Sequence, residues 1–369
     1  MIQSCDIAII GGGLAGLTAA LHLSNSNFNV LVFEKNPYPR HKVCGEYVSN
    51  EVLPYLNSLG IHPFQLGAKS ISLLQVSNRN GLESKSQLQL GGFGISRYTL
   101  DHHLYTKVKE RVPVLQETVT EVKFQSNQST IETLSGNTVQ ARFVIGAFGK
   151  RSNLDKSLLR PFIQKKTQWM AVKSHYTGDF PEHMVSLHHF KGGYCGLSKI
   201  ENNNVNLCYL TTIDAFKRYK VINDFEENAL SENPFLKNFL KQATPVFDTP
   251  LTISQISFER KKAVDNHVFM IGDSASLIHP LCGNGMAMAI TAAKLVADTF
   301  LQNKNSKRNE LEKIYMQKWN STFSKRLSYG RLLQAVMMNS ILLNTGLKLS
   351  KRNTNLISFA VSKTHGKPL

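Results

Sequence analysis

The sequence predicts an α/β fold in which a parallel sheet is interrupted by a β-rich insertion and followed by helices. Four short apolar runs have the unbroken hydrophobicity of strands that are buried on both faces: Ile7–Ile10, Val30–Phe33, Phe143–Ala147 and Val268–Ile271. Because these runs lie near both ends of the sequence, we expect one discontinuous domain that encloses the residues between them. Polar–apolar alternation with glycines between about 70 and 95 predicts antiparallel hairpins within that insertion.

Length and composition indicate a globular protein with a sizeable core. The chain has 369 residues, of which 42% are hydrophobic and 19% charged. No apolar stretch reaches the ~18 residues of a membrane-spanning helix, and the first residues lack the pattern of a signal peptide. Five irregularly spaced cysteines match neither a metal site nor a disulfide framework. We therefore expect a cytoplasmic protein without a bound metal.

The chain is strongly basic, with 43 Lys and Arg against 26 Asp and Glu and a net charge of +17. Such an excess attracts phosphates, nucleic acid or an anionic membrane surface. The sequence has neither zinc-finger spacing nor an RNA-binding aromatic signature, so we expect no nucleic-acid partner. The sequence leaves the oligomeric state open.

Periodicity and turn residues place the remaining elements. Helices are expected at Leu14–Leu23, Leu100–Arg111, around 213–241 and at about 285–302. Further strands are expected at Val112–Leu115, Thr120–Phe124, Thr130–Leu134, Val185–Phe190, Val205–Thr211 and Leu251–Phe258.

A glycine-rich turn follows the first strand and opens the first helix. Gly11, Gly13 and Gly16 match G-x-G-x-x-G, a pattern that allows a tight turn, close approach of a pyrophosphate and close helix–strand packing. The helix N-terminus offers N–H groups and partial positive charge to phosphates. Glu34 ends the second strand, where a carboxylate can bind a ribose. Together these features predict a dinucleotide site, and they leave NAD and FAD open.

A second motif near residue 270 separates the two dinucleotides. Val268–Ala275 resembles the second FAD motif of flavoprotein aromatic hydroxylases, geranylgeranyl reductases and flavin-dependent halogenases. The resemblance implies that Asp273 contacts the ribityl and pyrophosphate part of FAD. The following His279–Met286 is similar to the Pro-x-x-Gly-x-Gly run of that superfamily, which begins a helix facing the flavin. A helix dipole there would stabilise the negative charge of reduced flavin.

Two further segments resemble the same superfamily. Val144–Ser152 is similar to its middle motif, usually written Ala-Asp-Gly-x-x-Ser, but Phe148 stands where the Asp would be. That departure puts a hydroxylase-style contact with NADPH in doubt. Arg97 resembles the arginine of an R-x-x-L-(D/E) segment that reaches FAD in the superfamily. We interpret the nearby Asp101 as a structural acid in the first turn of a helix.

The segment Pro39–Glu46 is similar to the Lys/Arg-x-Cys-Gly-Gly/Glu segment that lies beside FAD in the geranylgeranyl reductase branch. Arg40 and Lys42 would neutralise the pyrophosphate. Cys44 would lie near the flavin ring, where we favour packing or loop geometry over chemistry. Glu46 is an acid–base candidate only if the fold buries it near substrate. Cys44 and Glu46 are the catalytic candidates, and no catalytic residue is identified.

The resemblance implies a glutathione-reductase-type Rossmann FAD domain from 1–68, 97–158 and 262–305. The substrate domain is expected from 69–96 and 159–261, and a helical region from 306–369. The residues expected to hold FAD are Gly11, Gly13, Leu14, Ala15, Gly16, Glu34, Lys35, Arg40, Lys42, Cys44, Gly45, Arg97, Val119, Ala147, Gly149, Gly272, Asp273, Pro280, Gly283, Asn284, Gly285 and Met286.

Several functions fit these motifs. We favour a reductase or dehydrogenase that transfers hydride at flavin N5 to an apolar isoprenoid, lipid or polyketide-like substrate, with NAD(P)H as transient reductant. A monooxygenase of an aromatic or polyketide substrate has the same motif order and stays open. A halogenase is disfavoured because its W-x-W-x-I-P segment is absent, the chain having only the distant Trp169 and Trp319.

A non-catalytic flavin-binding or membrane-surface protein is the remaining alternative. It is supported by the basic charge and by the apolar stretch Leu332–Leu349. We favour the interpretation that this stretch is a helix packed on the FAD domain. A basic amphipathic face would also allow peripheral contact with a membrane that supplies a lipid substrate.

Overall fold

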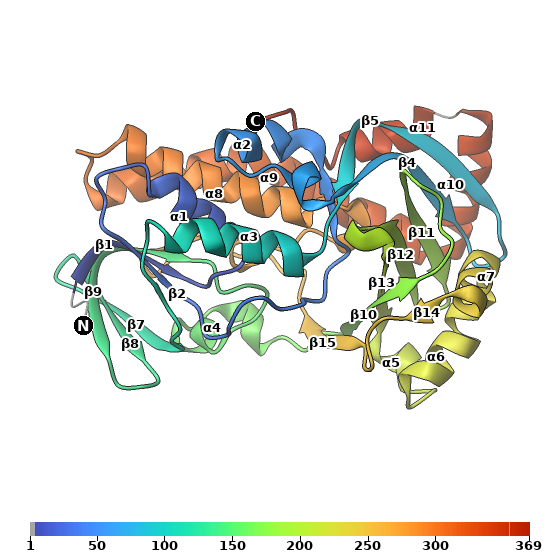
Figure 1. Cartoon of the computed structure of the whole chain (residues 1–369), viewed down its shortest axis with the longest axis horizontal. Helices are drawn as coiled ribbons and strands as arrows, with labels where there is room; N and C mark the ends of the chain where they lie inside the picture. The colour runs from blue at the N-terminus through green and yellow to red at the C-terminus, as the bar shows by residue number, and fades with distance from the viewer. Residues whose placement is uncertain (1–3, 354) are drawn as a thin grey trace.

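The computed structural model describes residues 4–353 and 355–369. It contains two sheets side by side, with helices packed along them (Figure 1). The first three residues of the predicted 1–68 segment, and residue 354 of the predicted 306–369 region, lie outside the described residues. The predicted fold class, a Rossmann-like α/β domain with a β-rich second part and a helical C-terminus, is confirmed.

The first sheet contains the four predicted apolar strands in parallel. Its order is β16 (Val264–Asp265), β17 (Val268–Met270), β9 (Thr138–Gly146), β1 (Ser4–Ile10), β2 (Val30–Phe33) and β6 (Val114–Leu115). The strands β7 (Val119–Gln125) and β8 (Gln128–Thr133) form an antiparallel hairpin, and β8 also pairs with β9. The residues of β2 are all buried, as expected for a strand covered on both faces.

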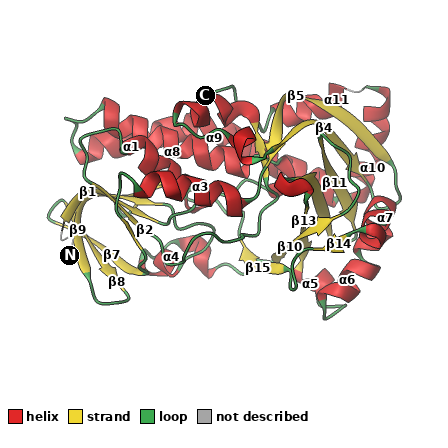
Figure 2. Cartoon of the chain, viewed as in Figure 1, coloured by secondary structure: helices red, strands yellow, loops and turns green. Residues whose placement is uncertain are grey.

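Helices cover one face of this sheet (Figure 2). Helix α1 (Leu14–Leu23) packs between α3 (Arg97–Lys109) and α8 (Gly285–Gln302), and α9 (Arg308–Met338) packs on α8. Helix α3 begins three residues before the predicted start, because the Ser96 hydroxyl accepts a hydrogen bond from the Thr99 N–H and caps the helix there. The predicted bounds of α1 and α8 are confirmed.

The second sheet is mostly antiparallel and contains the predicted hairpin of β4 (Lys69–Ser77) and β5 (Glu83–Gly94). Its order is β14 (Thr244–Pro245), β10 (Trp169–Thr177), β13 (Val205–Thr212), β12 (Gly193–Lys199), β11 (Met184–Phe190), β4, β5 and β3 (Tyr47–Ser49), and β15 (Leu251–Ile256) pairs with β10. The strand β3 joins this sheet from within the predicted 1–68 segment. The domain boundaries stay a prediction.

The prediction of one continuous helical stretch over 213–241 is wrong. The chain forms three separate helices there, α5 (Ile213–Phe216), α6 (Ile222–Asn228) and α7 (Pro234–Gln242). The left-handed backbone of Lys220 interrupts the first two, and Pro234 begins the third. The strands β10 and β12 were not predicted, because buried polar residues and glycines break their apolar pattern.

Two further helices follow α9 at the end of the chain. Helix α10 (Ser340–Arg352) begins at Asn339, whose side chain accepts hydrogen bonds from the N–H groups of Ile341 and Leu342. Helix α11 (Asn355–Ser362) and α10 pack against β5 at the outer edge of the second sheet (Figure 1). No helix in the described part of the chain is both long and apolar enough to cross a membrane.

Candidate functional site

Three parallel strands, β1, β9 and β17, end side by side at one edge of the first sheet. In the register of the parallel strands, Gly146 of β9 lies between Ile10 of β1 and Met270 of β17. The carboxyl ends of these strands therefore lie side by side, and each runs into one of the three glycine-containing motifs. This edge is where a parallel α/β sheet binds its ligands.

The turn after β1 is close-packed at two of its glycines. Gly11 has a φ of +109°, and a Cβ at this residue would overlap the carbonyl group of Ala147. A Cβ at Gly16 would overlap the carbonyl oxygen of Gly11, so the helix can only lie this close to the strand without a side chain there. These contacts are those that the glycine pattern predicts for helix–strand packing.

Gly13 faces a space bounded by cations. A Cβ at Gly13 would lie 3.6 Å from Nζ of Lys42 and 3.8 Å from Nη2 of Arg97. Gly13 is the N-cap of α1, and no side chain among the described residues caps this end. The free N–H groups of the helix and the two cations therefore surround a space that suits a phosphate.

Asp101 holds these two cations in place. The Asp101 carboxylate accepts hydrogen bonds from Nε and Nη2 of Arg97, both at 2.7 Å, and from Nζ of Lys42 at 2.8 Å. Burial by itself would raise the pKa of Asp101, but the charges of Arg97 and Lys42 outweigh burial and hold that pKa below its ordinary value. Asp101 lies in the second turn of α3 and not in the first turn, as the sequence predicted, because the helix begins at Arg97; its three hydrogen bonds still give it a structural role.

Glu34, at the end of β2, is held by the same turn. Its carboxylate accepts a hydrogen bond from the Gly12 N–H at 2.9 Å and one from Nη2 of Arg40 at 2.9 Å. The other terminal nitrogen of Arg40, Nη1, is buried and has no partner among the described residues. Arg40 thus pairs with Glu34 and still has a donor to offer to a ligand.

The glycine motif after β17 is hydrogen-bonded to the glycine motif after β9. The Gly149 N–H donates to the Ser274 hydroxyl at 2.8 Å, and Gly272 and Gly283 both have left-handed backbones. The Asp273 carboxylate makes no hydrogen bond to the described residues, although its main-chain oxygen accepts one from Lys261. These links fix the turn and leave the Asp273 side chain available to a ligand.

Helix α8 begins at this turn without a side-chain cap from the described residues. The side chain of Asn284, its N-cap residue, donates instead to the Thr364 carbonyl at 2.6 Å. A Cβ at Gly45 or Gly149 would have no described atom within 4 Å, so both glycines border open space. Two uncapped helix N-termini, bordering glycines and a cation pair fit a cofactor with a diphosphate and a flat ring.

Glu46 lies at the junction of the two sheets and is fully buried. It accepts hydrogen bonds from the Arg97 N–H (2.8 Å), Nζ of Lys173 (2.5 Å) and Nε2 of His175 (2.7 Å). Burial would raise the pKa of Glu46, but Lys173 and His175 hold it below its ordinary value. Burial, with the nearby positive charge of Lys173, lowers the pKa of His41 to about 4, and its ring packs 5.1 Å from that of His175.

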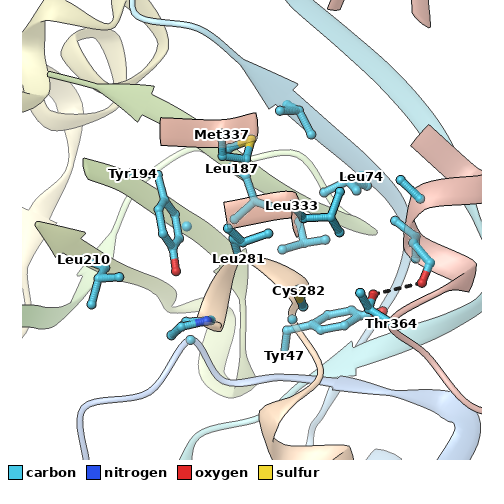
Figure 3. Close-up of a pocket in the computed structure, with 18 of the residues that line it drawn as sticks. Tyr47, Leu74, Leu187, Tyr194, Leu210, Leu281, Cys282, Leu333, Met337 and Thr364 are labelled. Carbon is cyan, nitrogen blue, oxygen red and sulfur yellow. Dashed lines mark hydrogen bonds between the residues drawn. The ribbon is translucent and has the colours of Figure 1, made fainter. Parts of the chain in front are cut away.

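A cavity of about 470 Å³ extends from this junction along the second sheet to the C-terminal helices. In Figure 3 the labelled side chains converge from strands of the sheet, from the turn at Pro280–Cys282 and from α9. The lining is overwhelmingly aliphatic and aromatic, and Cys44, Gly45 and Lys150 lie at its flavin-motif end. Such a volume is typical of a site for a small organic molecule.

The structure brings most of the predicted cofactor residues to this edge of the sheet. Lys35 is exposed, whereas Val119 is buried at the start of β7. Sequence reasoning missed Lys173 and His175, which are two apart on β10 and so point to the same side. It also missed the cavity lining from β11, β12 and the C-terminal helices, where no motif marks the residues. Within the described residues, all five cysteines are free thiols.

Comparison with known proteins agrees with this site. The model of the FAD binding domain family matches residues 4–318. Conditioned medium factor receptor 1 of Dictyostelium discoideum is 24% identical over 361 residues, covering 88% of this chain and 69% of the relative. A menaquinone reductase of Mycobacterium tuberculosis is 22% identical over 381 residues, covering 97% and 90%.

A third relative matches over a shorter segment of the chain. The 6-hydroxynicotinate 3-monooxygenase of Pseudomonas fluorescens is 27% identical over 186 residues, covering 47% of this chain and 48% of the relative. The chain thus spans about half the length of that protein.

Solved structures share the fold over nearly the whole chain. A flavin-dependent brominase superposes with a TM-score of 0.80 at 18% identity, covering 98% of this chain and 95% of the other. A geranylgeranyl bacteriochlorophyll reductase-like protein of Thermoplasma acidophilum gives 0.78 at 17% identity, covering 99% and 96%. The family match spans well over half of the chain, so the protein belongs to the FAD binding domain family and is a FAD-dependent oxidoreductase.

Proposed function

We propose that this oxidoreductase is a reductase or dehydrogenase that acts on an elongated apolar molecule, of isoprenoid, lipid or polyketide-like character. The observation that carries the proposal is the apolar cavity of about 470 Å³, which begins beside Cys44 and Gly45. Burial of apolar surface there would supply most of the binding free energy, and the few polar groups would fix orientation.

The residues of the site have separable roles in this proposal. Bound FAD supplies a hydride acceptor and donor at its N5 atom. Lys42 and Arg97 would bind its diphosphate, and the space beside Gly45 and Gly149 would accept the ring. Lys150, in the cavity lining, would place a positive charge near the reacting end of the substrate.

Glu46 is better suited to positioning than to proton transfer. Its carboxylate already accepts three hydrogen bonds from Arg97, Lys173 and His175, and its lowered pKa keeps it ionised at neutral pH. A group held in this way orients the N-terminus of α3, where Arg97 lies. For Cys44, which lines the cavity, we retain a packing role over chemistry.

A monooxygenase is the second candidate, and a shielded apolar cavity next to the flavin site would suit it too. The monooxygenase relative supports this alternative. We propose NAD(P)H as the reductant in either case. The two candidates differ in whether product formation needs O₂.

The deciding experiment uses the purified FAD-loaded enzyme under anaerobic conditions. NADPH or NADH is added until the yellow absorbance is bleached, followed by polyprenyl alcohols, unsaturated fatty acids or alkenylphenols, each of which has a C=C bond to accept a hydride and a proton. Return of the absorbance, with a product that gained two hydrogens, is expected for the reductase. If no compound restores the absorbance without O₂, and labelled O₂ places one oxygen atom in the product, the reductase proposal is wrong.

A further inference from the structure

The end of the cavity opposite the flavin motifs opens to solvent between the last helices. Leu332 at the end of α9 and Phe359 of α11 both line the cavity, and their side chains are nevertheless 59% and 60% exposed. Tyr329 and Leu356 combine the same two properties. These four side chains form a mouth whose rim is apolar.

Helix α10, beside the mouth, presents apolar side chains on two faces. Leu343 and Leu347 are buried and line the cavity. On the opposite side Ile341, which is 74% exposed, lies two turns before the exposed Leu349, so the two share a face. This helix packs on its own protein with one face and exposes leucine and isoleucine on the other. Such an exposed apolar face is typical of a surface that binds a partner.

We call the exposed set Leu332, Ile341, Leu342, Leu349, Leu356 and Phe359 the C-terminal apolar face. In Figure 1 the helices that carry most of it, α10 and α11, lie together at the outer side of β4 and β5. The face is therefore not spread over the molecule, and it surrounds or adjoins the cavity mouth.

The charged residues of the chain segment that carries this face have one sign. Residues 313–369 contain ten Lys and Arg and neither Asp nor Glu. Lys348, Lys351 and Arg352 are exposed on α10, and Lys363 lies in the lining at the end of α11. Exposed apolar side chains mixed with basic ones are the pattern of helices that lie in the interface of an anionic membrane.

We propose that the C-terminal apolar face docks on an anionic phospholipid bilayer with the cavity mouth against the lipid. Apolar side chains would enter the interface, and the surrounding lysines and arginines would contact the headgroups. An apolar substrate would then pass from bilayer to cavity without crossing water. This last step rests on the proposed function, whereas docking itself does not.

A second copy of this chain is the competing occupant of the face. The excess of Lys and Arg on the helices of this face argues against it, because two copies that meet through it would bring these like charges together. An anionic bilayer complements the charge instead.

The test is flotation of the FAD-loaded protein with phosphatidylcholine vesicles, with and without phosphatidylglycerol. We expect binding only to the anionic vesicles. Binding should fall steeply between about 0.1 M and 1 M NaCl, since the Debye length shortens from about 10 Å to about 3 Å. The outcome that overturns the proposal is a protein that stays at the bottom of the gradient with anionic vesicles at low salt.

Two double variants and two matched controls locate the contact. K348E/K351E should weaken vesicle binding about tenfold or more, because each basic residue near the surface contributes about a fivefold gain in affinity. I341S/L349S should weaken it too. The controls K217E/K220E and L134S/L159S change equally exposed residues elsewhere and should bind like the wild type.

The flavin absorbance of each variant checks that it is folded, since none of these residues lies at the flavin motifs. Equal losses in variants and controls would contradict the docking face. So would a light-scattering measurement in which the wild type is a dimer and I341S/L349S a monomer. Vesicle binding without turnover of any apolar compound refutes the proposed function alone. Turnover of detergent-dispersed substrate without vesicle binding refutes docking alone.

Discussion

The flavin-motif edge of the first sheet and the cavity beside the second sheet adjoin each other but use opposite kinds of group. At the first, backbone N–H groups, glycines and buried ion pairs such as Arg97 with Asp101 line a space that suits a polar ligand. At the second, aliphatic side chains from many elements enclose an apolar volume. Cys44 and Gly45 lie where the two regions meet.

This difference shows why ligand binding at a polar site depends on single side chains, whereas binding in an apolar cavity does not. A diphosphate site fails when one Cβ or one counter-charge is changed, because directed hydrogen bonds have few substitutes. An apolar cavity tolerates many side chains of suitable volume, because burial is non-directional. Substitutions should therefore have larger effects at the first region than at the second.

The largest effect is expected from Gly13→Leu. The leucine side chain would fill the space beside Lys42 and Arg97 and exclude the diphosphate. Loss of charge-assisted hydrogen bonds worth about 1.5–3 kcal/mol each lowers FAD affinity by at least about a hundredfold. Flavin absorbance per protein after gel filtration measures the loss. Gly13→Ala is the control and should stay yellow, because its Cβ makes ordinary contacts; a yellow Gly13→Leu protein would contradict the placement.

Removing the carboxylate in Asp101→Ala should lower the free energy of unfolding by about 3–5 kcal/mol, since it leaves two largely buried cations unpaired. Urea denaturation at neutral pH measures this. The same side chain predicts acid sensitivity. Its pKa is lowered in the folded state, so its stabilisation is present above the ordinary value of 3.8 and is lost as the pH falls through the lowered pKa. An Asp101→Ala protein with an unchanged acid limb would argue against this pair of contacts as the cause.

A smaller effect is expected from Leu187→Trp in the cavity. Leu187 of β11 lines the cavity, and the larger ring would fill part of it. Binding of the fluorescent probe Nile red should weaken about tenfold or more, because a misfit of even one methylene costs about 1–3 kcal/mol. The flavin content should stay at the wild-type level. Leu187→Ala, which enlarges the cavity, should bind the probe at least as well as the wild type.

The smallest effect is expected from Cys44→Ala. If Cys44 only packs in the lining, FAD affinity should change by no more than about twofold and the flavin midpoint potential by no more than a few millivolts, as expected for a half-buried thiol that makes only packing contacts. A dye-coupled reductive titration measures the potential. A shift of tens of millivolts would show instead that the thiol contacts the flavin ring.

The same contrast explains which parts of the site could be predicted from the sequence. The turn at Gly11–Gly16 and the Gly272–Asp273 motif are local, since each needs a few residues in a fixed order, and both lie where the sequence predicted. The cavity depends on side chains from strands, turns and helices distant in sequence, and nothing in the order of residues marks them. Physical burial of an apolar side chain looks the same in sequence whether it borders a core or a cavity.

The other site residues that the sequence did not reveal are buried polar ones. Lys173 and His175 lie on β10, a strand that the apolar pattern did not reveal. Their reason for burial is Glu46, which is more than a hundred residues away in sequence. The pairing Asp101–Lys42 is of the same kind, although there the acid was at least assigned a structural role. Long-range ion pairs of this kind have no local signature.

The Arg97–Asp101–Lys42 cluster has a practical consequence for handling the protein. Asp101 cancels one of the two cationic charges, so the cluster offers a residual charge of one to a diphosphate. Most of the attraction must then come from short hydrogen bonds in a buried place that mobile ions do not reach. The flavin should accordingly remain attached through a high-salt ion-exchange column, and the same column would strip anionic lipid from the basic exterior.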